Sequence, residues 1–532
     1  MPDDAATGPD SPADSGDGDS DSPADGADDD SDTPAGSGDG DSPVAQLAAG
    51  AGTGVVGRLG SKALSLVIEV LLTQFLGPSR YGRYVLGKSV ARIAQRLAQL
   101  GLTQGAVRYG SIHYEADDED ALAGVLTASL VLSAGAGVVA AAAVFALAGP
   151  LARSVFGDPA LAAPLRWFAA AIPFYVLLEV VAAYFRAFKR IDREQLLTSG
   201  LRPVANLALV GGAFLLGYRL AGAVAGFVLT GALAAAVGLS LLLRVHNAPV
   251  GFRAGWAGAR ATARKLLVYS LPMMLVSMSF LVATRTDRLM LGALATSESV
   301  GVYNVAATVS LQFSVVISSL LAIFKPIIAD VDENRDPERI PELYGVVAKW
   351  ATYGTVALFV VVALYSARIL SVFGPEFTAA RDVLAVLPLM YVGGAVFGPC
   401  GALLAMTGRE RIEVVNGVAL VVLNLVGNYL LIPEYGALGA AVAVVLAGTV
   451  VNVVQVSLVY RFYGFHPFDP AHILRIAVTV AVVAGVVLVG QDLALVARTA
   501  ACVALLAGIA GLFYVQIDPA ERDLIAGVFA EE

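Results

Sequence analysis

The sequence predicts an all-α polytopic membrane protein with about 14 transmembrane helices. Hydrophobic residues make up 57% of the 532 positions and charged residues only 15%, with a mean hydropathy of +0.72. Soluble domains average about 45–50% apolar and about 25% charged residues. The apolar residues are also gathered into stretches of roughly 20, the length that crosses a bilayer as a helix. A water-soluble fold of this composition would expose far more apolar surface than soluble proteins do.

Residues 1–43 precede the first apolar stretch and differ from the rest of the chain. They hold 14 Asp and no Lys or Arg, whereas the remaining 489 residues carry a net charge of +5. So few apolar residues cannot offset the entropy of ordering the segment. We expect a disordered acidic cytoplasmic tail, and the sequence pI of about 5.1 is a property of this tail.

Gly, Pro and charged clusters divide the rest of the chain into fourteen candidate spans. The connections between them are short and leave no room for a soluble catalytic domain. The spans cover residues 54–76, 84–106, 121–148, 161–185, 196–217, 221–243, 266–294, 301–324, 346–372, 382–406, 414–431, 437–460, 476–490 and 494–516.

Basic residues predict the orientation of these spans. When the connections are assigned alternately to two sides, eighteen Lys and Arg fall on the side of the N-terminus and five on the other. Cytoplasmic loops carry the excess of basic residues in membrane proteins. Both termini are therefore expected in the cytoplasm, and the chain is expected in the cell (cytoplasmic) membrane as a multi-pass protein.

The two halves of the predicted membrane region resemble each other. Val155-Phe156-Gly157 and Val372-Phe373-Gly374 lie 217 positions apart, as do Gly222-Ala223 and Gly439-Ala440. Six spans separate the copies, so the halves have the same orientation, and a substrate path is expected between them. The predicted domains are the tail 1–43, a six-helix lobe 50–243, a cytoplasmic linker 244–265, a second six-helix lobe 266–460, two extra helices 476–516 and a cytoplasmic tail 517–532.

Polar residues at helical spacing form a stripe on each of the first two predicted spans. The first stripe consists of Arg58, Lys62, Ser65, Glu69 and Thr73, and the second of Lys88, Arg92, Gln95, Arg96 and Gln99. One Arg or Lys facing lipid at the bilayer centre costs about 2.5–3.5 kcal/mol. The stripes are therefore expected to face a wet cavity. The two stripes together hold five basic residues and one acidic residue, Glu69, so their net charge is positive. A cavity wall of this charge suits a phosphate or pyrophosphate headgroup.

Several of these residues also have a simpler structural interpretation. Arg58 and Lys88 lie near span ends, from which their side chains can extend to the lipid headgroups. Glu69 is interpreted either as a structural partner of Lys62 or as a proton carrier.

A second charged cluster in the seventh span has two interpretations as well. Arg285, Asp287 and Arg288 form either a local ion pair or a gate between the lobes.

The sequence offers no pattern for catalysis or metal binding. Its two cysteines and four histidines never occur at metal-ligand spacing, and no phosphate-binding loop of the Gly-Lys-Ser/Thr type occurs. We therefore expect no catalytic residues, no metal and no cofactor, and we do not expect an enzyme.

Three junctions between spans resemble those of polysaccharide-biosynthesis flippases, which belong to the multidrug/oligosaccharidyl-lipid/polysaccharide (MOP) exporter superfamily. The similar segments are Leu76-Gly77-Pro78 with Tyr81-Gly82-Arg83-Tyr84, Asp287-Arg288 with Val300-Gly301-Val302-Tyr303, and Asn424 to Tyr429 with Ile432-Pro433. The resemblance covers about residues 50–516. It implies a fold like that of multidrug and toxin extrusion (MATE) transporters, in which two lobes alternate access and move a polyprenyl-linked sugar to the outer leaflet.

A flippase for a polyprenyl-(pyro)phosphate-linked saccharide is thus the favoured function, with roles in polysaccharide or glycoprotein assembly. Its expected partners are that lipid, the surrounding membrane lipids and glycan-assembly enzymes, but no nucleic acid. One alternative is an ion-coupled multidrug antiporter of the same superfamily, for which acidic rather than basic cavity residues are expected. A membrane-embedded lipid-linked glycosyltransferase is disfavoured because no large outer loop or paired-carboxylate site occurs.

Overall fold

The computed structural model describes the backbone of residues 43–245, 255–333, 339–465 and 494–516. Side chains within these ranges are described except for 43–59, 255–261, 272–273, 275–285 and a few residues beside the gaps. The chain divides into two compact units, Met1–Thr53 and Gly54–Glu532. Every described helix after the first one lies in the second unit. The described residues contain helices and no strand, in agreement with the predicted fold class.

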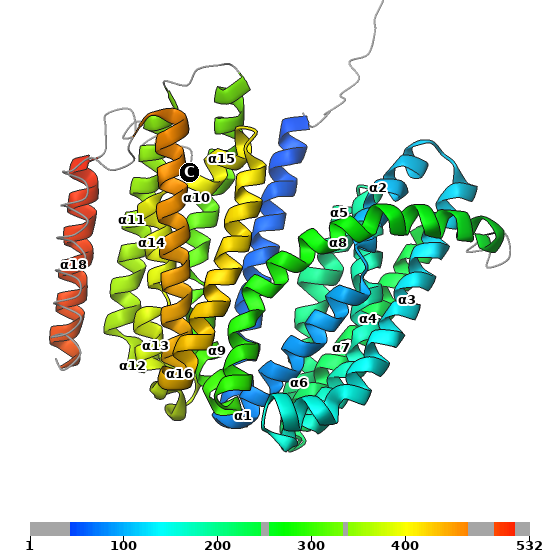
Figure 1. Ribbon diagram of the computed structural model, residues 1–532, viewed down its shortest axis with the longest axis horizontal. Coiled ribbons are helices and arrows are strands. Elements are labelled where there is room, and N and C mark those ends of the chain that lie inside the picture. The colour runs from blue at the N-terminus through cyan, green and yellow to red at the C-terminus, as the bar shows by residue number, and fades with distance from the viewer. Residues whose placement is uncertain (1–42, 246–254, 334–338, 466–493, 517–532) are drawn as a thin grey trace, which may run out of the picture. The chain divides into compact units, whose positions relative to one another are not determined.

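The helices follow the predicted apolar stretches along the chain (Figure 1). They are α1 (Pro43–Ala98), α2 (Leu102–Glu115), α3 (Glu119–Pro150), α4 (Ala162–Ala187), α5 (Ile191–Gln195), α6 (Arg202–Leu215), α7 (Leu220–Val245), α8 (Gly255–Leu294), α9 (Ser297–Ser310), α10 (Phe313–Glu333), α11 (Ile340–Leu364), α12 (Ser366–Phe373), α13 (Arg381–Val386), α14 (Leu389–Phe397), α15 (Cys400–Met406), α16 (Glu410–Tyr463) and α18 (Leu495–Gln516). Short π or 3₁₀ turns occupy Leu151–Val155, Pro159–Leu161, Leu196–Leu201 and Pro375–Ala380.

Nine helical stretches in the described part of the chain are long and apolar enough to cross a membrane. Two of them contain a sharp bend. Gly77 in α1 has φ 68° and ψ 171°, and Gly436 in α16 has φ 54° and ψ −128°. Only glycine adopts such angles without steric cost, so each bend joins two successive predicted spans. The predicted tails and the predicted span 476–490 lie outside the described residues.

The structure interrupts some stretches that the sequence predicts as continuous spans. Span 84–106 breaks after Ala98, because Leu100 and Gly101 adopt positive φ values of 48° and 71° before α2 begins. A Cβ atom on Gly101 would overlap the backbone carbonyl of Ser270 in α8, so the break lets α2 and α8 approach closely. Spans 301–324, 346–372 and 382–406 are also divided between shorter helices.

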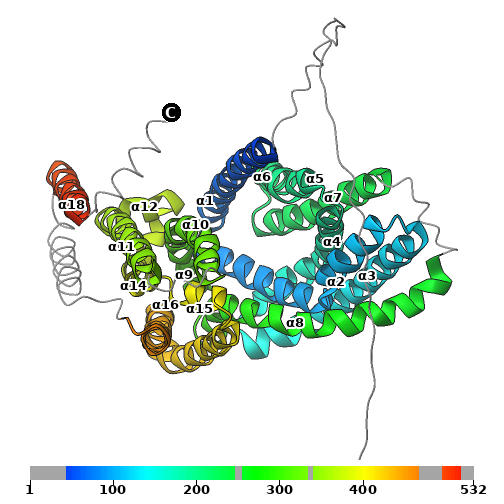
Figure 2. The same ribbon diagram turned by 90° about the horizontal axis from the view of Figure 1, so that it is seen from above.

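The helices of the second unit pack as two groups that α8 connects (Figure 2). In the first group α4 packs against α2, α3 and α7, and α6 packs against α7. In the second, α11 packs against α10, α14 and α18, and α16 packs against α14 and α15. Helix α8 contacts α3 in the first group and α16 in the second. Its path therefore places residues from both groups beside one another.

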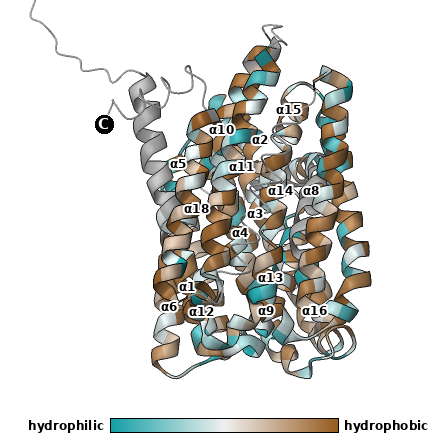
Figure 3. Cartoon of the chain, turned by 90° about the vertical axis from the view of Figure 1, so that its left-hand side faces the viewer, coloured by the Kyte–Doolittle hydropathy of each residue, from teal (hydrophilic) through white to brown (hydrophobic). Residues whose placement is uncertain are grey.

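Many large hydrophobic side chains lie on the outer surface of the helices (Figure 3). On α18, Val496 is 81% exposed and Val515 is 77% exposed, and on α3, Val139 is 70% exposed. Apolar side chains at this density on the surface are typical of a membrane interface. Because helices satisfy their own backbone hydrogen bonds, they can present these side chains to lipid. The chain is a multi-pass membrane protein.

Successive long helices run in opposite directions and define two ends of the second unit. One end, called the Asp158 end, holds Gly77, Asp158, Ser297 and Val372, and α12 marks it at the lower edge of Figure 1. The amide of Gln74 donates to the carbonyl of Val372 there, at 2.7 Å. The opposite end, called the Arg409 end, holds the short segments that directly follow the last residues of α1, α4 and α15.

Candidate functional site

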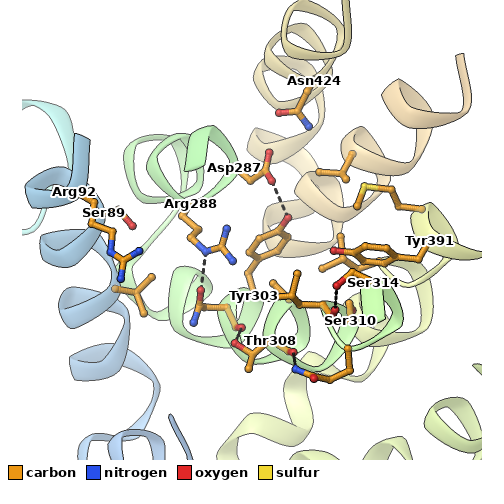
Figure 4. Close-up of a pocket in the computed structure, with 18 of the residues that line it drawn as sticks. Ser89, Arg92, Asp287, Arg288, Tyr303, Thr308, Ser310, Ser314, Tyr391 and Asn424 are labelled. Atoms are coloured by element: carbon orange, nitrogen blue, oxygen red, sulfur yellow. Dashed lines mark hydrogen bonds between the residues drawn. The ribbon is translucent and has the colours of Figure 1, made fainter. Parts of the chain in front are cut away.

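A cavity of about 1160 Å³ lies between the helices of the second unit. Both halves of α1 line it, together with α8, α9, α10, α14 and α16, so segments far apart in the sequence meet around it (Figure 4). Among the side chains that the structure describes, six charged ones line it: Lys62, Glu69, Lys88, Arg92, Asp287 and Arg288. All six are residues that the sequence singles out, from both predicted stripes and from the charged cluster of the seventh span.

The basic side chains approach the cavity from two sides. Lys62, Lys88 and Arg92 come from α1, and Arg288 comes from α8. Lys88 Nζ lies 5.4 Å from the ring centroid of Tyr84, a distance at which a cation is attracted to the aromatic face. The four cations outnumber the two carboxylates, so the lining carries a net positive charge. Such a lining attracts phosphate oxygens.

Two further charged residues lie near Arg92. Arg202 on α6 and Glu179 on α4 lie close enough to interact electrostatically with Arg92. Arg202 lies outside the two predicted stripes, and only the packing of α6 beside α1 brings it near the cavity wall. Sequence spacing within one helix cannot indicate a neighbour of this kind.

Arg96 differs from the position that the sequence predicts for it. Its side chain is exposed and does not line the cavity, and its Nη1 donates to Gln99 Oε1 at 2.8 Å. The sequence places Arg96 midway along a span that continues to residue 106. Because α1 ends at Ala98, Arg96 instead lies in the last turn of the helix. The side chains of Arg58 and Arg285, the other two predicted site residues, lie outside the described side chains.

Glu69 belongs to a hydrogen-bond network that joins α1 to α9. Its Oε1 accepts from the hydroxyl of Tyr81 and, at 2.9 Å, from Nδ2 of Asn304. Asn304 Nδ2 also donates to the Tyr81 oxygen at 2.6 Å, and Arg288 Nε donates to Asn304 Oδ1 at 2.6 Å. Within the described residues no ion pair joins Glu69 to Lys62. The structural partners of Glu69 are therefore Tyr81 and Asn304 rather than the predicted Lys62.

Asp287 lies buried where α8, α9 and α16 meet. Its Oδ2 accepts from the hydroxyl of Tyr303 at 3.2 Å and its Oδ1 from Nδ2 of Asn428 at 3.0 Å. Asn428 also donates to Asn424 Oδ1, one helical turn away, at 2.9 Å. Neutral donors thus hold Asp287, while Arg288 extends toward Asn304 (Figure 4). In the described part of the chain, no group of three or more His, Cys, Asp or Glu could hold a metal ion.

Contacts among α1, α9 and the turn at Pro159–Leu161 close the structure at the Asp158 end. Arg83 Nε and the Ser297 hydroxyl both donate to Asp158 Oδ2 at 2.7 Å. Asp158 Oδ1 accepts from the backbone N–H of Ala160 at 3.1 Å. We call Arg83, Asp158 and Ser297 the Asp158 cluster. The sequence shows Asp158 only as a single acid in a connection, because its partners lie 75 and 139 positions away.

The Asp158 cluster should respond to acid in a defined range of pH. Burial by itself raises the pKa of the Asp158 carboxyl, but hydrogen bonds from Arg83 and Ser297 hold that pKa below its ordinary value. A carboxyl whose pKa is lower in the folded state stabilises the fold above its unfolded pKa of ~3.9. This contribution is lost as pH falls through the lower folded-state pKa.

We expect Asp158→Asn to lower the free energy of unfolding by about 1–2 kcal/mol at neutral pH. The difference in melting temperature between the parent protein and the variant should be constant above about pH 5 and shrink toward zero at lower pH. Thermal unfolding of both proteins in detergent at a series of pH values measures this. A difference that instead grows as pH falls below 4 would contradict the assignment.

Comparison with known proteins identifies related sequences and folds. A family model described as "Polysaccharide biosynthesis protein" matches residues 47–331. The chain is 25% identical over 398 residues to the "Lipid III flippase" of Escherichia coli (strain K12), and the alignment covers 71% of this chain and 89% of that protein. The protein of the same name from Shigella flexneri matches to the same extent.

Two solved structures have a similar fold. The structure titled "Lipid II flippase MurJ, inward closed conformation" superposes with a TM-score of 0.67 and 13% identity, covering 89% of this chain and 99% of that one. The structure titled "Inward-facing conformation of a multidrug resistance MATE family transporter of the MOP superfamily" superposes with a TM-score of 0.56 and 16% identity, covering 75% and 98%. At these identities the likeness establishes the fold alone, which is the predicted MATE-like fold.

Proposed function

The chain belongs to the polysaccharide biosynthesis protein family, and from this premise we propose that it is a flippase for a lipid-linked saccharide. The carrier is a polyprenyl phosphate or pyrophosphate, and the cargo moves from the cytoplasmic to the outer leaflet of the cell membrane. It is a transporter rather than an enzyme, since it breaks no bond of its substrate. The relatives named lipid III flippase support this function.

The observation that carries the proposal is the net positive charge of the cavity. The barrier to moving a lipid across a bilayer is the desolvation of its charged headgroup, because the lipid tail remains in an apolar environment throughout. Arg92 and Arg288 offer planar forks that pair with two phosphate oxygens, and Lys62 and Lys88 offer point charges. The cavity therefore needs to hold only the phosphates and sugars, while the polyprenyl tail stays in lipid.

The proposed transport is by alternating access between two lobes, 50–243 and 266–460, which the linker 244–265 joins. In the proposed orientation the Arg409 end, both termini and both tails, 1–43 and 517–532, face the cytoplasm, which the excess of basic residues on that side supports. The Asp158 end then faces outward, and the Asp158 cluster closes the outer side of the cavity. The helices 476–516 extend the second lobe. Glycan-assembly enzymes supply the substrate on one side and consume it on the other.

Deletion of the gene tests the function directly. Mass spectrometry of polyprenyl-linked saccharides should detect a completed lipid-linked saccharide that accumulates in the deletion strain, while its surface glycan is depleted. Restoring the gene should reverse both changes. Unchanged lipid and glycan profiles, in a strain without a second flippase, would contradict the proposal and favour the drug-antiporter alternative.

A further inference from the structure

The side of the cavity opposite the cations of α1 is uncharged and polar. Thr308, Gln312 and Ser314 line it at the junction of α9 and α10, and Tyr391 on α14 lies beside them (Figure 4). We call these four residues the acceptor face. The helix is interrupted at Leu311–Gln312, between the end of α9 and the start of α10.

The hydroxyl hydrogens of Thr308 and Ser314 and one of the two amide hydrogens of Gln312 are bonded to their own helices. Thr308 Oγ1 donates to the carbonyl of Asn304 at 2.8 Å, and Ser314 Oγ donates to the carbonyl of Leu311 at 2.6 Å. Gln312 Nε2 donates to the carbonyl of Thr308 at 3.1 Å. A hydroxyl has one hydrogen and two lone pairs, so each hydroxyl oxygen remains an acceptor. The amide oxygen of Gln312 is an acceptor as well.

Acceptor groups discriminate between the two parts of a lipid-linked saccharide. Ionised phosphate oxygens carry no hydrogen and are acceptors themselves, so the hydroxyl oxygens of Thr308 and Ser314 and the amide oxygen of Gln312 offer them no hydrogen bond. The neutral donors on this face, the second amide hydrogen of Gln312 and the Tyr391 hydroxyl, bind phosphate more weakly than the cations of α1 do. Sugar hydroxyls are donors as well as acceptors and can donate to Thr308, Gln312 and Ser314. The cations of α1, in contrast, bind phosphate oxygens strongly and sugar hydroxyls weakly. The two sides of the cavity thus suit different parts of one substrate.

The ring of Tyr391 adds an apolar surface to the same side. Its plane is nearly parallel to that of Phe313, at 23°, with the ring centroids 6.3 Å apart. Phe313 is fully buried, so the Tyr391 ring packs beside an immobile neighbour. The electron-rich face of an aromatic ring attracts weakly positive hydrogens. The C–H face of a pyranose ring carries such hydrogens and is also apolar.

We propose that the acceptor face binds the saccharide of the cargo, while the basic side chains bind its phosphate. This inference rests on the proposed flippase function and deepens it, because it assigns recognition of the sugar to α9, α10 and α14. Substitutions on the acceptor face change which saccharides are accepted, and substitutions among the cations change how tightly any polyprenyl phosphate is held.

Two lipid probes separate the contributions of the two sides. One is polyprenyl pyrophosphate without sugar, and the other is the lipid-linked saccharide fraction extracted from the cells that make this protein. Binding of both is measured on the full-length protein in lipid nanodiscs for Thr308→Val, Gln312→Leu and Tyr391→Leu. Thr449→Val is a matched control, because its hydroxyl donates to the carbonyl of Val445 in the same way but is exposed outside the cavity.

We expect each acceptor-face variant to bind the saccharide-linked lipid about fivefold to tenfold more weakly, as loss of one hydrogen bond or ring contact predicts. Binding of polyprenyl pyrophosphate should be unchanged, and Thr449→Val should bind both probes normally. Arg92→Gln should weaken both probes.

Equal weakening of both probes by the acceptor-face variants would overturn the inference and leave these residues a structural role. Normal binding of both probes by those variants would overturn it as well. If the parent protein binds neither probe, the proposed flippase function itself fails. That outcome is distinguishable from a loss confined to the acceptor-face variants.

Discussion

Replacing Arg92 with glutamine should abolish transport of the lipid-linked saccharide, whereas Arg96→Gln should leave transport near the parent level. Arg92 lines the cavity together with three other cations, but Arg96 is exposed in the last turn of the helix and donates to Gln99. The proposed partner of Arg92 is a phosphate of the substrate, and removing one partner of a desolvated charge pair typically costs about 2–5 kcal/mol. That corresponds to a loss of roughly 30-fold to several thousandfold in the rate or affinity that depends on the pair.

The two variants control for each other because they change the same residue type on the same helix. Transport is measured as the initial rate at which labelled lipid-linked saccharide becomes accessible on the far side of reconstituted vesicles, normalised to protein content. Thermal unfolding checks that both variants remain folded. A similar loss of transport in both variants would contradict the placement of Arg96 outside the cavity, and full activity of Arg92→Gln would remove Arg92 from the substrate site.

The contrast between Arg92 and Arg96 also marks the limit of what the sequence predicts. Hydrophobic runs predict the helices well, because burying apolar surface in lipid requires about 20 such residues whatever the tertiary contacts. Where α1 ends depends on a tertiary contact instead, since Gly101 turns the chain so that α2 meets α8 beside Ser270. A span that continues to residue 106 predicts both arginines in the cavity, whereas the helix that ends at Ala98 brings only Arg92 to the cavity lining.

The partners of the charged residues are the part that spacing cannot predict. The sequence indicates that Glu69 needs a partner, but the amide that contacts it belongs to Asn304, 235 positions further along the chain. Asp287 and Asn428 are similarly separated by 141 positions. Local spacing identifies which side chains are too polar for lipid, and only the packing of α8, α9 and α16 determines which of them meet.

The internal repeat links sequence and fold more directly. Gly157 and Gly374 occupy equivalent places in the two sequence copies, and both adopt positive φ values, 59° and 130°. Each follows a helical segment at the Asp158 end. A repeated Val-Phe-Gly motif therefore corresponds to a repeated change of chain direction, which a glycine permits. Such matches are visible in the sequence because they depend on backbone geometry rather than on distant side chains.

Gly301→Ala should prevent closure of the cavity at the Asp158 end and reduce transport at least tenfold. A Cβ atom at Gly301 would overlap the backbone carbonyl of Pro78 and would lie 3.2 Å from the backbone nitrogen of Gly82. These are backbone atoms that cannot rotate away, so α1 and α9 must separate. Relieving such overpacking costs typically about 1–3 kcal/mol, which is enough to shift a two-state equilibrium roughly tenfold or more.

Cysteine labelling measures this shift in the open and closed populations. In a background of Cys400→Ala and Cys502→Ala, an Ala307→Cys reporter places one thiol in the cavity. A membrane-impermeant maleimide is added separately to each side of the membrane. The thiol should be protected from reagent on the side of the Asp158 end in the parent protein and react there once Gly301 is alanine.

The matched control for Gly301→Ala is Gly211→Ala on α6, where no atom lies within 4 Å of the added Cβ. That variant should keep both the parent rate of transport and the parent labelling pattern, because an added methyl group there meets open space. Gly301→Ala tests closure rather than substrate binding, since the overlap lies between α1 and α9 outside the cation-lined cavity. Normal transport together with a protected reporter thiol in Gly301→Ala would show that α1 and α9 need not meet there, and would refute the assignment of this contact as the closure.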